Sequence, residues 1–140
     1  MTSPRPDEFD IPSHFQHWPG DNAEDSIGPF FYFMEDGDSC TAFRAQPRNC
    51  NSHGSAHGGV LMAFADYTLC IAANGGAHQS VVTVSQNNEF IAPVHAGDLI
   101  SGRGEVVRSG GSIVFVRGEL CVGDETVLIC SAVIKRLRQS

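Results

Sequence analysis

The sequence has 140 residues, of which 41% are hydrophobic and 18% charged, and its formal net charge is −7. These proportions are typical of one globular domain and exclude a disordered chain, and no apolar run is long enough to cross a bilayer. Nine acidic residues and one arginine precede Ser39, whereas seven acidic and eight basic residues follow, so the chain lacks the broad basic surface of a non-specific nucleic-acid binder.

Residues 1–27 hold four of the seven prolines and many acidic residues, and we interpret them as an acidic extension of a domain over residues 28–140. The first ten residues are polar, unlike a signal peptide, so we expect a cytoplasmic protein. The segment 28–35 (GPFFYFME) predicts a strand, and a turn leads into a second strand over residues 39–45.

Residues 57–73 (HGGVLMAFADYTLCIAA) predict a long helix, which ends at the Asn74-Gly75-Gly76 sequence because glycine readily adopts the left-handed conformation. This helix is apolar on nearly every face, so we expect it to be buried on all sides. Turn residues separate the remaining predicted strands, which span residues 80–91, 99–108, 112–122 and 126–137. The order predicts an α+β architecture with a strongly curved antiparallel sheet wrapped around one helix.

Five scattered cysteines, an odd number, predict reduced thiols rather than a disulfide framework. Cys50, His53 and His57 approach a metal-ligand spacing, but a structural zinc site usually has four ligands and no fourth lies nearby. We therefore expect no metal site.

Asp66 is the only side chain normally charged at neutral pH between Asn49 and Asn88, and it lies in the middle of the apolar helix. Burying an unpaired carboxylate is costly, and aspartate is a mediocre helix former. The residue therefore has either a functional role or a structural one, at a loop or a wet subunit seam.

The start of the predicted helix, His57-Gly58-Gly59, offers unpaired N–H groups and the positive end of the helix dipole. Such a place can bind an anion or stabilise a developing oxyanion, although close packing is an equally common reason for glycine. His57 and Asp66 lie on opposite helix faces, separated by roughly 13 Å along the axis. If both serve one site, they come from two copies of the helix, and catalysis requires a dimer.

The segment 51–59 (NSHGSAHGG), followed by Asp66, resembles the signature of the PaaI-type thioesterases of the hot-dog superfamily. The segment 87–93 (NNEFIAP) and the strand order also match, and the resemblance covers about residues 28–137. It implies a hot-dog fold, with a curved antiparallel sheet around one long central helix, and a homodimer with active sites at its interface. Many similar proteins are dimers of dimers, and the sequence leaves this choice open.

The resemblance implies an acyl-CoA thioesterase in which the Gly58 N–H polarises the thioester carbonyl. Asp66 of the partner subunit then activates water as a general base or attacks as a nucleophile. Asn51 and His57 orient the loop and the thioester, and Thr83 helps to place the water or the substrate. A structural histidine and an ordinary strand threonine are the alternatives for His57 and Thr83. No cofactor is implied, because coenzyme A enters as part of the substrate.

The phosphates of coenzyme A require positive or N–H-rich contacts. A hairpin turn matches a position that touches the nucleotide in the family, and a segment near residue 90 lines the pantetheine channel. The implied substrate-binding residues are Arg108, Ser109, Gly110, Gly111, Ser112, Phe90, Pro93 and Arg136. Met62, Phe64 and Tyr67 are expected to line the acyl pocket, whose choice of chain the sequence does not define.

Two other functions stay open. Hydratases and dehydratases of the same fold also pair a histidine with an acidic residue, although the motifs that usually accompany them are missing. A module that binds acyl-CoA without turnover is the other, although the N-terminal extension has no basic helix-turn-helix pattern.

Overall fold

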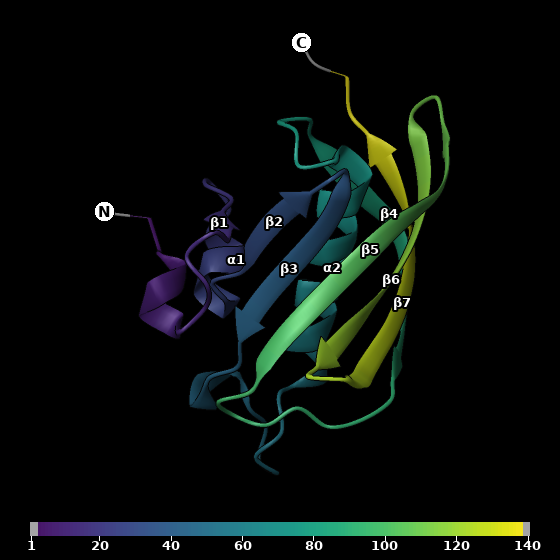
Figure 1. Ribbon diagram of the computed structural model, residues 1–140. Helices are drawn as coiled ribbons and strands as arrows, with labels where there is room; N and C mark the ends of the chain where they lie inside the picture. Colours follow the sequence, from purple (N-terminus) through teal and green to yellow (C-terminus); the bar gives the residue numbers. More distant parts are fainter. Residues whose placement is uncertain (1–2, 139–140) are drawn as a thin grey trace.

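The computed structural model describes residues 3–138, in which one antiparallel sheet of seven strands curves around the long helix α2 (Gly58–Asn74) (Figure 1). The predicted α+β architecture is therefore confirmed. The strands are β1 (Gln16–His17), β2 (Phe31–Glu35), β3 (Asp38–Arg44), β4 (Val81–Phe90), β5 (Leu99–Gly110), β6 (Ile113–Val122) and β7 (Glu125–Arg136).

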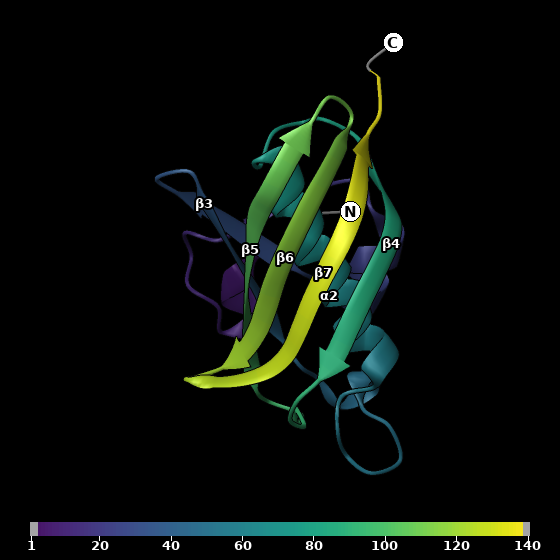
Figure 2. The same cartoon turned by 90° about the vertical axis from the view of Figure 1, so that its right-hand side faces the viewer.

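The strands lie in the order β1-β2-β3-β5-β6-β7-β4. The three C-terminal strands form the predicted meander, because short turns with Gly111 and Gly123 at positive φ join neighbours. Strand β4 returns to pair with β7 and forms one border of the sheet (Figure 2). Among the described residues, no strand pairs with the outer edge of β4.

Helix α2 begins after His57, whose Nδ1 accepts a hydrogen bond from the Gly59 N–H, and ends at Gly75 in the left-handed conformation. One side of the helix is buried against the sheet, where Phe64 packs between aromatic rings of the core. The opposite side remains partly open, with Met62 40% exposed. The expected burial on every side is therefore wrong for the single chain, because the sheet covers only one side of the helix.

The N-terminal extension contains a short 3₁₀ helix η1 (Pro6–Phe9), strand β1 and a helix α1 (Asn22–Ile27). Strand β1 pairs with β2, which extends the sheet, and Ile11 is buried against Phe31. The sequence did not predict α1, and β2 begins later than expected because the Gly28 N–H caps this helix instead of joining the sheet.

The segment before α2 holds α1 in place. It contains the 3₁₀ helix η2 (Pro47–Asn49). The Asn49 side-chain amide donates to the Ile27 carbonyl at 2.8 Å, and the Arg48 guanidinium donates to the carbonyls of Ser26 and Gly28. These bonds satisfy the free carbonyls at the end of α1 and fix its position beside α2.

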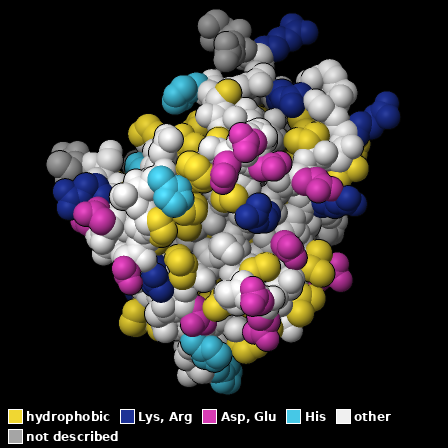
Figure 3. Space-filling model, viewed as in Figure 1, with side chains coloured by type: hydrophobic (Ala, Val, Ile, Leu, Met, Phe, Trp, Pro, Cys, Tyr) yellow, Lys and Arg dark blue, Asp and Glu magenta, His cyan; other side chains and the backbone are white. Residues whose placement is uncertain are grey.

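Basic and acidic side chains are interspersed on the face shown in Figure 3, with no continuous basic patch there. Among the residues that the structure describes, no helix is long and apolar enough to cross a membrane.

Candidate active site

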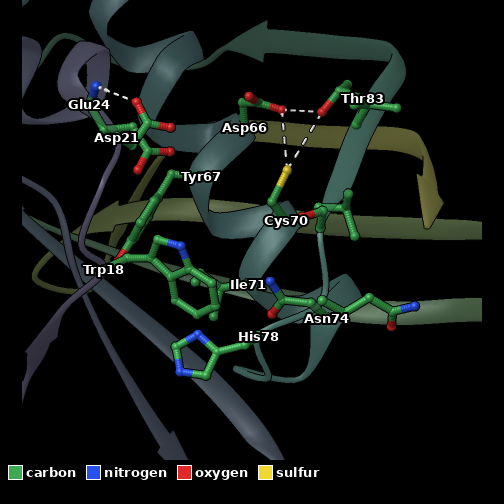
Figure 4. Close-up of a pocket in the computed structure, with 14 residues that line it drawn as sticks. Trp18, Asp21, Glu24, Asp66, Tyr67, Cys70, Ile71, Asn74, His78 and Thr83 are labelled. Carbon is green, nitrogen blue, oxygen red and sulfur yellow. Dashed lines mark hydrogen bonds between the residues drawn. The ribbon is translucent and has the colours of Figure 1, made fainter. Parts of the chain in front are cut away.

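A pocket of about 540 Å³ lies along the open side of α2 (Figure 4). The N-terminal extension, α2, the following loop and the start of β4 contribute to its walls. The lining residues are Trp18, Asp21, Glu24, Asp66, Tyr67, Cys70, Ile71, Asn74, His78, Gln79, Ser80, Val81, Val82 and Thr83. The structure thus brings together two of the predicted site residues, Asp66 from α2 and Thr83 from β4.

Asp66 is half-buried, and its oxygen Oδ1 accepts a hydrogen bond from the Thr83 hydroxyl at 2.5 Å. The Cys70 thiol, one helical turn further along α2, lies 3.7 Å from the same oxygen and 3.6 Å from the Thr83 hydroxyl. Within residues 3–138, no cation pairs with Asp66, and its second oxygen Oδ2 accepts no hydrogen bond. One oxygen is therefore fixed, while the other is available to a water molecule or a substrate.

Cys70 was not among the predicted site residues, although its spacing of four from Asp66 places both on one helix face. Burial, followed by the negative charge of Asp66, raises the pKa of the Cys70 thiol to about 12. The residue therefore remains a neutral thiol at physiological pH and donates to the carboxylate. A thiolate nucleophile at this position is disfavoured.

Glu24 in α1 was not predicted either, because nothing in the local sequence indicates that the extension reaches α2. Burial, then the nearby Asp21 and Asp66, raise the pKa of Glu24 to about 8. Trp18 lies on the same wall and packs against Tyr32 and His78, with ring centroids 5.7 Å and 5.3 Å away. The extension thus contributes both acidic and aromatic groups to the pocket.

The start of α2 lines a second pocket, which is largely apolar. Its lining residues are Ala56, Gly58, Leu61, Phe90, Ile91, Ala92, Pro93 and Val94, so Gly58, Phe90 and Pro93 are brought together. Within the described part of the chain, the Gly58 N–H has no hydrogen-bond acceptor, whereas the Gly59 N–H is capped by His57. The Gly58 N–H can therefore serve a ligand.

Asn51 and His57 both form hydrogen bonds within the segment that leads into α2. Asn51 Oδ1 accepts hydrogen bonds from the His53 and Ser55 N–H groups at 2.9 Å and 3.2 Å. Cys50 donates its thiol hydrogen to the Gln46 carbonyl. Between residues 3 and 138, no three His, Cys, Asp or Glu side chains gather in a way that could hold a metal ion.

The hairpin between β5 and β6 contains the predicted residues from Arg108 to Ser112. The Arg136 guanidinium crosses from β7 to donate to Ser109 Oγ at 2.8 Å. Gly111, Ser112 and Arg136 line a third pocket together with Ala77, His78, Gln79, Leu137 and Arg138.

The three residues expected in the acyl pocket lie in three different parts of the structure. Tyr67 lines the pocket that contains Asp66, and Met62 is exposed on the open side of α2. Phe64 instead faces the core, because it lies two positions before Asp66 and therefore on the other side of the helix.

A family model described as the thioesterase superfamily matches residues 53–129. A Pseudomonas aeruginosa protein, whose name describes it as a candidate esterase, is 30% identical over 112 residues, covering 78% of this chain and 84% of that protein. A Haemophilus influenzae protein named as an uncharacterised acyl-CoA thioester hydrolase is 33% identical over 79 residues. That match covers 56% of this chain and about half, 51%, of the relative.

Solved structures show the same fold. The Escherichia coli PaaI protein of the phenylacetic acid degradation operon has a TM-score of 0.77 and 21% identity, covering 86% of this chain and 88% of that chain. A hypothetical thioesterase of Streptococcus pneumoniae, solved with coenzyme A, has a TM-score of 0.71 and 18% identity. The match covers 81% of this chain and 91% of that chain. The predicted hot-dog arrangement is therefore confirmed.

Proposed function

Because this chain belongs to the thioesterase superfamily, we propose that it hydrolyses the thioester of an acyl-coenzyme A to a free acid and coenzyme A. The observation that carries the proposal is the environment of the Asp66 carboxyl group. It lines a pocket, one of its oxygens accepts a hydrogen bond from the Thr83 hydroxyl, and the other oxygen is available to a ligand. The reaction needs no further cofactor, because coenzyme A is part of the substrate. The expected cytoplasmic location stays a prediction.

In the proposed reaction, Asp66 takes a proton from a water molecule whose oxygen attacks the thioester carbonyl carbon. The carbon–sulfur bond then breaks, the carbonyl re-forms as the acid, and the proton passes to the departing thiolate of coenzyme A. Direct attack by the carboxylate, followed by hydrolysis of the anhydride, has the same overall balance. Thr83 positions the carboxylate in both routes by its hydrogen bond to Oδ1.

The carbonyl oxygen needs a hydrogen-bond donor as negative charge develops on it, and the free Gly58 N–H at the start of α2 is suited to this role. In the single chain, Gly58 and Asp66 line different pockets. We therefore place the complete site between two subunits, where Asp66 of one chain faces Gly58 of the other.

Strand β4 is the proposed dimer interface. It is an edge strand of ten residues, and Val82, Val84 and Phe90 on it are between 43% and 60% exposed. Such an edge favours pairing with another strand. Because Thr83 contacts Asp66 and Phe90 lies beside Gly58, an antiparallel pair of β4 strands centred near Gln86 would place Asp66 close to the partner's Gly58.

The nucleotide of coenzyme A is assigned to the β5–β6 hairpin from Arg108 to Ser112 and to Arg136. The bond from Arg136 to Ser109 supports this assignment, because it holds a guanidinium beside the turn of this hairpin. The Streptococcus pneumoniae structure, which contains coenzyme A, shows that this fold accommodates the ligand.

The proposal is tested by measuring free thiol release from short, medium, long and aryl acyl-CoAs with wild type and Asp66→Asn. We expect turnover by wild type and a loss of about a hundredfold or more in the variant, because amide nitrogen cannot accept the proton of water. Asp124→Asn is the matched control, since Asp124 is exposed in the β6–β7 turn. Each variant is first checked for folding by circular dichroism.

Three outcomes would contradict the proposal. Binding of acyl-CoA without thiol release by wild type would indicate a binding module. Water addition to an enoyl-CoA without thiol release would indicate a hydratase of the same fold. Full activity of folded Asp66→Asn would leave the fold unchanged but refute the assignment of the carboxylate.

A further inference from the structure

The extension provides one wall of the pocket that contains Asp66. Trp18, Asp21 and Glu24 lie on this wall, across the pocket from α2 (Figure 4). Asp21 caps α1 by accepting a hydrogen bond from the Glu24 N–H at 3.0 Å, and the bonds from Arg48 and Asn49 fix the other end of this helix. The wall is therefore a fixed part of the fold.

The pocket is acidic. Asp21, Glu24 and Asp66 line it, no lysine or arginine does, and none of the three forms an ion pair within residues 3–138. The pKa of Glu24 is raised because burial and its acidic neighbours disfavour a further negative charge at this position. The same conditions disfavour any other anion in this pocket.

The remaining walls suit an uncharged chain. Trp18, Tyr67 and Ile71 contribute aromatic and aliphatic surface. Tyr67 is only 3% exposed, and its hydroxyl has no hydrogen-bond partner in the described part of the chain. This hydroxyl lies next to Trp18 in Figure 4 and adds a polar but uncharged group to the wall.

We propose, on the basis of the thioesterase activity proposed above, that Trp18, Asp21 and Glu24 determine acyl specificity. The pocket accepts acyl chains with an uncharged end and rejects chains of equal length that end in a carboxylate. An incoming carboxylate would lose its hydration and meet Asp21 and Asp66, and among the lining residues only His78 can carry a positive charge.

Trp18 is the only tryptophan of the chain, so its fluorescence reports occupancy of this wall. We would titrate the S-hexyl thioether of coenzyme A and its analogue with a carboxylate at the end of the same chain. At neutral pH the uncharged ligand should bind wild type about tenfold more tightly or better. Calorimetry would measure the same binding independently of fluorescence.

The matched variant is Asp21→Asn/Glu24→Gln, in which asparagine retains the helix cap while the charge of Asp21 and the titratable group of Glu24 are removed. We expect the difference between the two ligands to shrink to about threefold or less. Asp124→Asn removes one charge at an exposed turn, as the variant does at neutral pH through Asp21, and should leave the difference unchanged. Relative kcat/KM values for hexanoyl-CoA and adipoyl-CoA should follow the same order.

Equal binding of both ligands to wild type would overturn the inference, as would a preference that survives in Asp21→Asn/Glu24→Gln. Binding seen by calorimetry without a change in Trp18 fluorescence would show that the chain does not enter this pocket, and absence of all binding would equally contradict the inference. Thioethers cannot be hydrolysed, so these results are independent of thiol release, which tests the proposed function through Asp66.

Discussion

Asp66 and Glu24 are carboxyl groups that share one pocket but have different surroundings. Asp66 keeps its place in an otherwise uncharged helix because a hydroxyl and a thiol contact one oxygen while the pocket leaves the other open. Glu24 is half-buried and lies near Asp21 and Asp66, and burial followed by these charges favours its protonated form. One residue is therefore suited to accept a proton, and the other to remain neutral.

The pKa of Glu24 predicts a dependence of stability on pH. In the folded chain this pKa is raised from 4.5 to about 8, so folding favours the protonated carboxyl. The resulting stabilisation is complete below pH 4.5 and is lost as the pH rises through about 8. The free energy of unfolding of wild type should therefore fall across this interval more than that of Glu24→Gln.

Urea denaturation at a series of pH values measures this difference. Glu125→Gln, at an exposed position, should follow wild type. Parallel curves for wild type and Glu24→Gln would show that Glu24 has the same pKa in the folded and unfolded chains.

At the scale of elements, α2 approaches the sheet closely because glycines on β5 face it. A Cβ atom at Gly102 would lie 2.3 Å from Thr41 Oγ1 and 2.7 Å from Thr68 Oγ1. These two hydroxyls are fully buried and lie 2.7 Å apart in a hydrogen bond. The glycine therefore makes room for a buried polar contact between β3 and α2.

Gly102→Ala should lower the free energy of unfolding by about 2 kcal/mol or more, because the methyl group would displace this hydroxyl pair. Gly110→Ala is the control, since a Cβ atom there meets nothing within 4 Å. Chemical denaturation of both variants measures the effect. Equal stabilities would mean that the strand and helix separate at little cost.

At the scale of the whole molecule, the edge of β4 beside the open side of α2 is left uncovered. The exposed side chains Met62, Val84 and Ile91 lie on or next to this region and are 40%, 60% and 54% exposed. A second copy of the chain would cover them and bring Asp66 to the helix start of its partner. In the proposed mechanism, activity therefore requires a dimer.

Subunit mixing tests the shared site. Gly58→Pro removes the N–H group that is proposed to donate to the carbonyl oxygen of the substrate. Proline is tolerated at this first helical position, and His57 before it already has the extended backbone that a residue before proline adopts. Asp66→Asn and Gly58→Pro should each be inactive, but heterodimers of the two should regain about half of the activity, because one site then retains both groups. Gly58→Ala, which keeps the N–H, is the control. Inactive heterodimers would place Asp66 and Gly58 in separate functions.

The sequence by itself determined the main helix and the strands from residue 31 onward, and it singled out Asp66 as the candidate catalytic carboxylate. The long apolar run of α2 and the turns between the C-terminal strands are local signals, so they indicate the helix, the strands and the meander without knowledge of the fold. Asp66 was detectable because a lone charge in an apolar helix conflicts with its surroundings. The signature in residues 51–59 indicated the family, and the resemblance to that family supplied the expected roles of Gly58 and Thr83.

Only the tertiary structure decided which distant residues meet Asp66. Glu24 reaches the pocket because hydrogen bonds from Arg48 and Asn49 hold α1 against the segment before α2, and the local sequence does not indicate these hydrogen bonds. The open side of α2 was equally unpredictable. An apolar helix face has the same pattern whether its own sheet covers it or a second subunit does, so burial is decided by the assembled fold.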